Sequence, residues 1–168
     1  MKTIYASGCA GLLCACVLLS ASVGARGAGA PGKGAYTVLS EEDLGKLLDQ
    51  MGYAPKKLKK GYLVEIKRDT WTVNIQLVLS ADGTKLGMNS NLGVIENAAE
   101  VTREQWMGLL TTNGKIDPSF FYFDDDAKKL FLHRTLDNRA IDAEMMRKQI
   151  DTFCGNVIAT GDVWKFTK

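Results

Sequence analysis

Residues 71–79 carry the pattern that most restricts the fold, because apolar and polar side chains alternate along them. A period of two places one set of side chains on a buried face and the other towards water, as in a strand covered on one side. Ala81-Asp82-Gly83 follows and is typical of a hairpin turn, since an Asp-Gly pair tolerates positive φ. The segment therefore predicts an antiparallel sheet. The apolar positions of the strand are Trp71, Val73, Ile75, Leu77 and Leu79.

Helical and strand-like periods alternate along the rest of the chain. Helices are predicted where a capping residue precedes apolar residues that recur every three or four positions. These segments are 40–51, 102–113 and 138–159. Short apolar runs between turn residues predict further strands at 62–67, 84–90, 120–123 and 130–132. The order helix, three strands, helix, two strands, helix indicates an α+β fold, with an antiparallel sheet of about five strands and three helices.

The amino-terminal segment predicts export. Residues 1–25 have the form of a secretory signal peptide, with Lys2 before an apolar run and small residues that place cleavage between Ala25 and Arg26. An uncleaved membrane anchor, or lipid attachment within Cys14-Ala15-Cys16, is the alternative. Residues 26–35 then form a flexible glycine-rich linker, and residues 36–168 a single α+β domain. We expect a periplasmic or secreted protein with no stable membrane span after cleavage.

Charge and cysteine content exclude several classes of protein. The chain has 21 Lys and Arg against 19 Asp and Glu, so its net charge of +2 is too small for non-specific nucleic-acid binding. After cleavage only Cys154 remains, so no internal disulfide is possible. The basic run from Lys56 to Lys60 predicts a solvated linker, with binding to anionic lipid as the alternative.

Candidate chemical groups have simpler structural interpretations. Asp124-Asp125-Asp126 suggests a metal, but no glutamate follows in the register of a calcium loop, so an acidic hairpin turn is favoured. A catalytic pair of Cys154 and His133 is conceivable, yet Cys154 lies in an apolar helical pattern that favours a buried, inert thiol. Phosphate-binding and nucleophile-elbow motifs are absent from the sequence. We therefore expect no catalytic, cofactor-binding or metal-binding residue, and no enzyme activity.

Residues 36–168 resemble the type III secretion chaperone-like fold, and most closely its YbjN-type branch. The resemblance rests on the element order, on Leu47-Leu48 and Gly52-Tyr53 of the first helix, on the strand 71–79 and on the long closing helix. It implies a small α+β module that binds proteins, commonly as a homodimer, without chemistry of its own. The export signal departs from this pattern, because secretion chaperones work in the cytosol.

The second hairpin suggests where a partner would bind. Phe120-Phe121-Tyr122-Phe123 and Leu130-Phe131-Leu132 are apolar on both faces, which is typical of a strand covered on both sides or in contact with another chain. We take Phe121, Phe123 and Phe131 as the candidate interaction surface. The sequence thus predicts an exported, non-enzymatic protein-binding module that self-associates as a homodimer. Any other protein partner is unidentified. The alternative is a periplasmic small-molecule-binding or enzyme-like domain with a pocket between sheet and helices.

Overall fold

The computed structural model describes residues 38–139 and 141–167. The expected signal peptide, the cleavage site between Ala25 and Arg26, and the glycine-rich linker lie outside the described residues. The helices are α1 (Glu41–Gln50), η1 (Ala98–Glu100, a 3-10 turn), α2 (Arg103–Asn113), α3 (Ala143–Ala159) and α4 (Gly161–Trp164). The strands are β1 (Lys56–Lys57), β2 (Tyr62–Arg68), β3 (Trp71–Leu79), β4 (Lys85–Val94), β5 (Ser119–Asp124) and β6 (Lys129–Asp137).

All strands form one antiparallel sheet in the order β1-β2-β3-β4-β6-β5. The predicted α+β architecture is confirmed, with six strands in place of about five. The additional strand is β1, which lies in the basic run that was predicted to be a linker, so that prediction is wrong for Lys56 and Lys57. Its two exposed lysines give no apolar period, and only pairing with Leu63 and Tyr62 of β2 makes it a strand.

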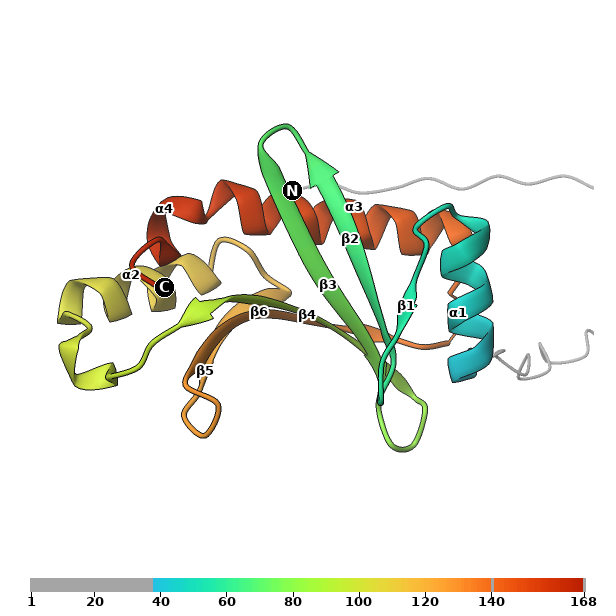
Figure 1. Ribbon diagram of the computed structural model, residues 1–168, viewed down its shortest axis with the longest axis horizontal. Coiled ribbons are helices and arrows are strands. Elements are labelled where there is room, and N and C mark those ends of the chain that lie inside the picture. The colour runs from blue at the N-terminus through green and yellow to red at the C-terminus, as the bar shows by residue number, and fades with distance from the viewer. Residues whose placement is uncertain (1–37, 140, 168) are drawn as a thin grey trace, which may run out of the picture. The chain divides into compact units, whose positions relative to one another are not determined.

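The helices pack on one face of the sheet. Figure 1 shows α3 running along one side of the strands. Contacts of three helices agree: Gly45 of α1 lies against Tyr62, Gly161 of α4 against Trp71, and Trp106 of α2 against Phe123. We call the uncovered side the open face. The covered side holds the core, whose fully buried members include Leu44, Leu48, Val64, Ile75, Leu77, Met88, Leu132, Met146, Ile150 and Phe153.

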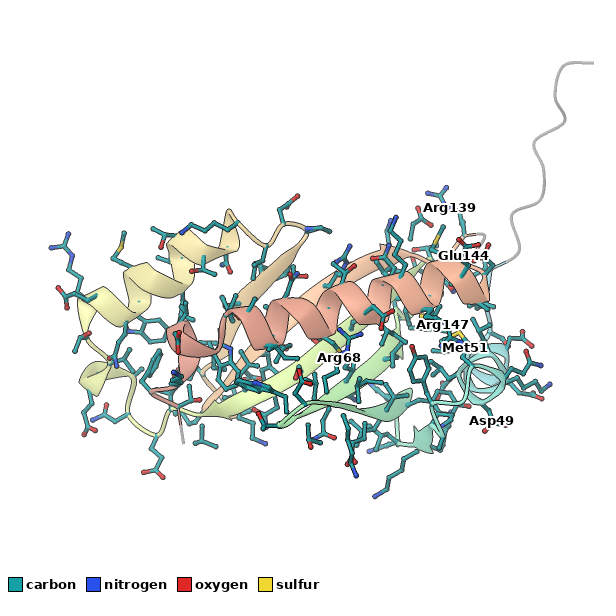
Figure 2. The ribbon with its side chains drawn as sticks, turned by 90° about the horizontal axis from the view of Figure 1, so that it is seen from above. Asp49, Met51, Arg68, Arg139, Glu144 and Arg147 are labelled. Atoms are coloured by element: carbon teal, nitrogen blue, oxygen red, sulfur yellow. The ribbon has the colours of Figure 1, made fainter. Side chains whose placement is uncertain are left out.

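Polar contacts along α3 fix this helix on the sheet. Figure 2, seen from above, shows α3 lengthwise over the strands with Arg68 beneath its middle. Arg68 pairs with Asp151 of α3 and also donates to its carbonyl oxygen at 3.4 Å. Arg147 lies close to Met51 in the same view, and its guanidinium stands over the Tyr53 ring at 5.8 Å. These contacts join α3 to β2 and to the end of α1.

Helix starts follow the predicted capping residues, with one exception. The Ser40 hydroxyl accepts from the Asp43 amide at 3.1 Å, and Thr102 and Gln105 form the expected capping box. The closing helix, however, begins at Ala143 and not at 138, because Asp142 is its N-cap. Asn138 is fully buried before it, and its Nδ2 donates to the carbonyls of Leu39 and Gly83 at 2.9 and 2.8 Å. The Asn138 side chain therefore bridges two loops and lies outside the helix.

Candidate protein-binding surface

Four rings gather on the open face at the end of the sheet formed by β5 and β6. The β5–β6 register pairs Phe120 with His133 and Tyr122 with Phe131, so all four side chains point away from the helices. Tyr122 stacks on Phe131 with ring centroids 5.2 Å apart, and Phe120 meets His133 edge-on at 5.1 Å. Phe120 is 41% exposed and Tyr122 37%. We call these four residues the open-face aromatic cluster, which is an apolar patch of the kind that marks interaction sites.

The structure divides the predicted interaction surface between the two faces. Phe131 belongs to the open-face aromatic cluster, but Phe121 is 6% exposed and lies in the core. Phe123 also faces the helices and packs edge-on against Trp106 at 5.9 Å. Assigning Phe121 to a surface was therefore wrong, because a buried ring is not available to a partner.

Sequence reasoning missed Phe120 and Tyr122, although a signal for them was present. The acidic turn after Asp124 sets the hairpin register, and counting back from the Asp124–Lys129 pair places Tyr122 opposite Phe131. Side chains opposite each other share a face, whereas neighbours along a strand do not. The register therefore predicts that Tyr122 and Phe120 lie on the same face of the sheet as Phe131. It places Phe121 and Phe123 on the other face.

His133 occupies the middle of the open face with both ring nitrogens engaged. Its Nδ1 lies 2.7 Å from Asn89 Oδ1, and its Nε2 lies 2.7 Å from the Thr135 hydroxyl. A neutral imidazole satisfies both, with Nδ1–H donating to Asn89 and Nε2 accepting from Thr135. Partial burial lowers the pKa of His133 below its ordinary value, because desolvation disfavours the charged ring. The centre of the open face is thus uncharged at neutral pH.

A hollow lies beside His133, above Gly87 of β4. It has a volume of about 270 Å³ and shares Asn89 and His133 with a second hollow of about 410 Å³ that is lined by Phe120 and Tyr122. The first hollow exists because Gly87 has no side chain to fill the space between Val78 and Thr135, its partners on β3 and β6. A shallow depression therefore continues from the aromatic rings to the glycine.

Charged side chains lie at the ends of the open face. Lys85 on β4 is 3.5 Å from Asp137 on β6 at one end, and Asp124 is paired with Lys129 at the other. The open face thus has aromatic rings at its β5–β6 end, uncharged polar groups in its middle and charged groups at its ends.

The two edges of the sheet differ in how far they are closed to strand addition. On the outer side of β5, the Phe121 amide donates to Asn113 Oδ1 at 2.7 Å, and Asn113 Nδ2 donates back to the Phe121 carbonyl at 3.4 Å. The Ser119 amide is bonded to the Ile116 carbonyl at 2.8 Å. At the opposite edge, β1 is a strand of two exposed lysines that pairs only with Tyr62 and Leu63, so no strand of the described ranges covers residues 64–68 of β2. The occupied backbone groups discourage strand pairing at β5, next to the open-face aromatic cluster, whereas the β2 edge is covered over two residues only.

The remaining candidate groups are not assembled into a chemical site. Cys154 is fully buried on α3, so the expected burial of the thiol is confirmed, and burial raises its pKa to about 11. His133 lies on the opposite face of the sheet, so the two do not form a pair. The predicted acidic turn is confirmed between Asp124 and Lys129. Within residues 38–139 and 141–167, no cluster of three or more His, Cys, Asp or Glu side chains could hold a metal ion.

Hollows beside the helices are the other concave surfaces. One of about 230 Å³ is lined by Glu96, Glu100 and Phe166 among others, and one of about 580 Å³ lies between α2 and the carboxyl-terminal segment. None of the helices in the described ranges is both long and apolar enough to cross a membrane.

Comparison with known proteins identifies the fold. No protein-family model matches this chain, and no curated protein sequence does. A chain in the crystal structure of the ExsC–ExsE complex is similar with a TM-score of 0.53 and 15% identity, covering 74% of this chain and 92% of its own length. A chain in the heterodimeric ExoU–SpcU complex from the type III secretion system of Pseudomonas aeruginosa is similar with a TM-score of 0.52 and 13% identity. That match covers 73% of this chain and 98% of the other. YbjN from E. coli is similar with a TM-score of 0.54 and 14% identity, and the match covers 73% of this chain and 88% of YbjN. The chain therefore has the fold shared by YbjN and type III secretion chaperones.

Proposed function

We propose that this chain is an exported, non-enzymatic protein-binding module that self-associates, and that it binds through the open face of its sheet. The observation that carries the proposal is the open-face aromatic cluster, in which Phe120 and Tyr122 remain about two-fifths exposed while Phe121, between them in sequence, is buried. Covering such rings with a protein surface removes apolar area from water, at roughly 25 cal/mol per Å². Aromatic rings of this kind are enriched among residues that dominate binding energy.

Further support comes from the surroundings of the open-face aromatic cluster. The β5 edge beside the cluster is occupied by Asn113, and the centre of the face carries no charge that a partner would have to desolvate. Two of the similar solved structures are complexes of two proteins, ExsC–ExsE and ExoU–SpcU. Cys154 and His133, the residues considered for catalysis, are held apart by the sheet.

Sedimentation velocity tests self-association, using the protein purified after expression of the full chain. We expect the mass to rise towards that of a dimer as the concentration increases to about 200 µM. Phe120→Asp adds a charge at the exposed ring and should abolish the rise. Thr72→Asp is the matched control, because Thr72 is exposed on the same face but lies on β3 near Trp71, away from the rings. A wild-type protein that stays monomeric, or a Phe120→Asp variant that associates normally, contradicts the proposal.

Export is tested separately. Expression of the full chain in a bacterial host, followed by fractionation and amino-terminal sequencing, should yield a processed protein that begins at Arg26. A chain that keeps Met1 and stays in the cytosol would remove the exported part of the proposal without affecting self-association.

A further inference from the structure

The open face carries both a projection and a hollow, and they are related by symmetry. His133 on β6 pairs with Phe120 on one side and with Asn89 on the other. Two residues before His133, Phe131 pairs with Tyr122 on β5; two residues after it, Thr135 pairs with Gly87 on β4. The exposed Tyr122 ring and the hollow above Gly87 are therefore diagonal opposites about His133. With strands about 4.8 Å apart and a rise of about 3.3 Å per residue, each lies about 8 Å from it.

We propose that the occupant of the open face is a second copy of this chain, related by a twofold axis that lies in the interface and passes over His133. This inference rests on the proposed function and specifies the contact. Such an axis places Tyr122 of each copy in the hollow above Gly87 of the other, and brings the two His133 side chains together. A twofold interface requires this kind of self-complementary patch.

Charge complementarity agrees with the arrangement. Asp124 follows Tyr122 on β5, and its side chain lies beyond the ring on the same face. Lys85 lines the hollow above Gly87. When Tyr122 of one copy enters the hollow of the other, Asp124 is carried towards Lys85 of that copy. The same operation repeats the contact on the other side of the axis, so each Lys85, which also lies 3.5 Å from Asp137 of its own chain, gains Asp124 of the other copy as a second acidic neighbour.

The sheet geometry also suits this axis. To place Tyr122 of one copy over Gly87 of the other, the axis must run perpendicular to the line that joins these two residues within one copy. Because that line is inclined to the strands, the twofold operation makes the strands of the two copies cross at roughly 70°. That angle is close to the orthogonal class of sheet packing, which suits twisted sheets. Figure 1 shows β4 and β6 arching across the molecule, and two arched sheets fit better crossed than aligned.

The available area sets the expected strength. The contact covers β3, β4, β6 and β5 over about seven residues of each strand. This region measures roughly 14 Å across the strands and roughly 23 Å along them, which is roughly 330 Å² of flat surface per copy. A standard interface buries about 800 Å² per partner, so this contact belongs to the weak, transient class. We expect a dimer that forms at high concentration and dissociates on dilution.

Complementation between two variants tests the contact. Tyr122→Ala removes the projection, and Gly87→Val fills the hollow, because a Cβ there already lies 3.4 Å from His133 Cε1. Each variant alone should weaken dimerisation at least about tenfold in sedimentation equilibrium. An equimolar mixture should dimerise more tightly than either variant alone, since the mixed dimer keeps one intact contact between Tyr122 and Gly87. Leu110→Ala, at a 62% exposed position on α2, is the control and should leave the dimer unchanged.

Crosslinking provides a readout that does not require Gly87→Val to fold. His133→Cys treated with a short bismaleimide should give a covalent dimer, because the axis brings the two positions together across facing sheets about 10 Å apart. Thr72→Cys should not crosslink. Both variants also carry Cys9→Ser, Cys14→Ser and Cys16→Ser, so that an unprocessed chain cannot crosslink through those thiols, and the buried Cys154 does not compete.

The outcomes separate this inference from the proposed function. If the wild type dimerises but Tyr122→Ala and Gly87→Val do not weaken the dimer, the axis is wrong and self-association stands. If the mixture is no tighter than either variant, or if Thr72→Cys crosslinks as well as His133→Cys, the contact between Tyr122 and Gly87 is overturned. A wild type that is monomeric throughout contradicts the proposed self-association itself.

Discussion

Gly161 and Gly155 show how strongly one residue's surroundings determine what a substitution does. A Cβ on Gly161 would lie 2.8 Å from Cη2 of Trp71, closer than real contacts allow. A Cβ on Gly155, inside α3, would meet nothing within 4 Å. The same chemical change therefore has opposite consequences at two nearby glycines.

We predict that Gly161→Ala lowers the free energy of unfolding by about 1–3 kcal/mol, because the methyl group must displace the Trp71 ring. Gly155→Ala should raise it by up to about 1 kcal/mol, because alanine is the better helix former. Urea denaturation of both variants beside the wild type measures the difference. Equal effects of the two substitutions would contradict the packing of α4 against Trp71.

His133 makes stability depend on pH. Its folded-state pKa is lowered by desolvation, and the groups around the ring, Asn89, Thr135, Phe120 and Tyr122, bring no charge that would stabilise the imidazolium. The unfolded chain therefore binds the proton more readily than the folded chain. The resulting stability is present above the unfolded pKa of about 6.5 and is lost as the pH falls through the folded value.

Urea unfolding at pH 7.5 and pH 5 measures this dependence. We expect the loss of stability between the two pH values to be smaller for His133→Gln than for the wild type, because glutamine cannot take up the proton. An identical loss in both proteins would show that His133 contributes nothing to the pH dependence.

At the scale of elements, β5 is an edge strand that α2 keeps closed. The Asn113 side chain imitates a neighbouring strand by serving both the amide and the carbonyl of Phe121. The last residue of α2 therefore does for β5 what a seventh strand would do. At Phe121 the protection depends on this single side-chain amide group.

We predict that Asn113→Ala lowers the free energy of unfolding by about 1–2 kcal/mol, because it leaves the backbone groups of Phe121 without partners. It should also cause association through the freed edge, measurable by light scattering and unaffected by a second substitution, Tyr122→Ala. Asn113→Asp keeps the acceptor for the Phe121 amide and loses the donor, so its effect should be intermediate. No change in stability with Asn113→Ala would contradict the edge contact.

At the scale of the whole molecule, one sheet serves two purposes. Its covered face packs against the helices and provides the stability of the fold, whereas its open face carries rings that the helices do not reach. Phe121 and Phe120 are neighbours in sequence and belong to different faces. Their substitutions should therefore separate folding from association.

We predict that Phe121→Asp prevents folding, because it places a charge in the core where Phe121 is 6% exposed. Phe120→Asp should retain the wild-type circular dichroism spectrum and melt cooperatively, with a change in the free energy of unfolding of about 1 kcal/mol or less. Thermal denaturation followed by circular dichroism compares the two. A folded Phe121→Asp protein would place Phe121 outside the core.

The sequence by itself determined the local structure and the buried character of several residues. Alternation along β3, the caps at Ser40 and Thr102, and the apolar stripe around Cys154 each depend on residues close together in the chain, where propensity and period act directly. They were enough to predict an α+β fold with a closing helix.

Only the tertiary structure decided which surface is free. Because β6 lies between β4 and β5, residues far apart in the chain, such as Asn89, Phe120 and His133, become neighbours, and the pairing register places Phe131 with Tyr122 and not with Phe121. A shift of one residue in register would exchange the two faces, and no local period records that choice. The side on which the helices pack then determines which rings are buried and which remain exposed.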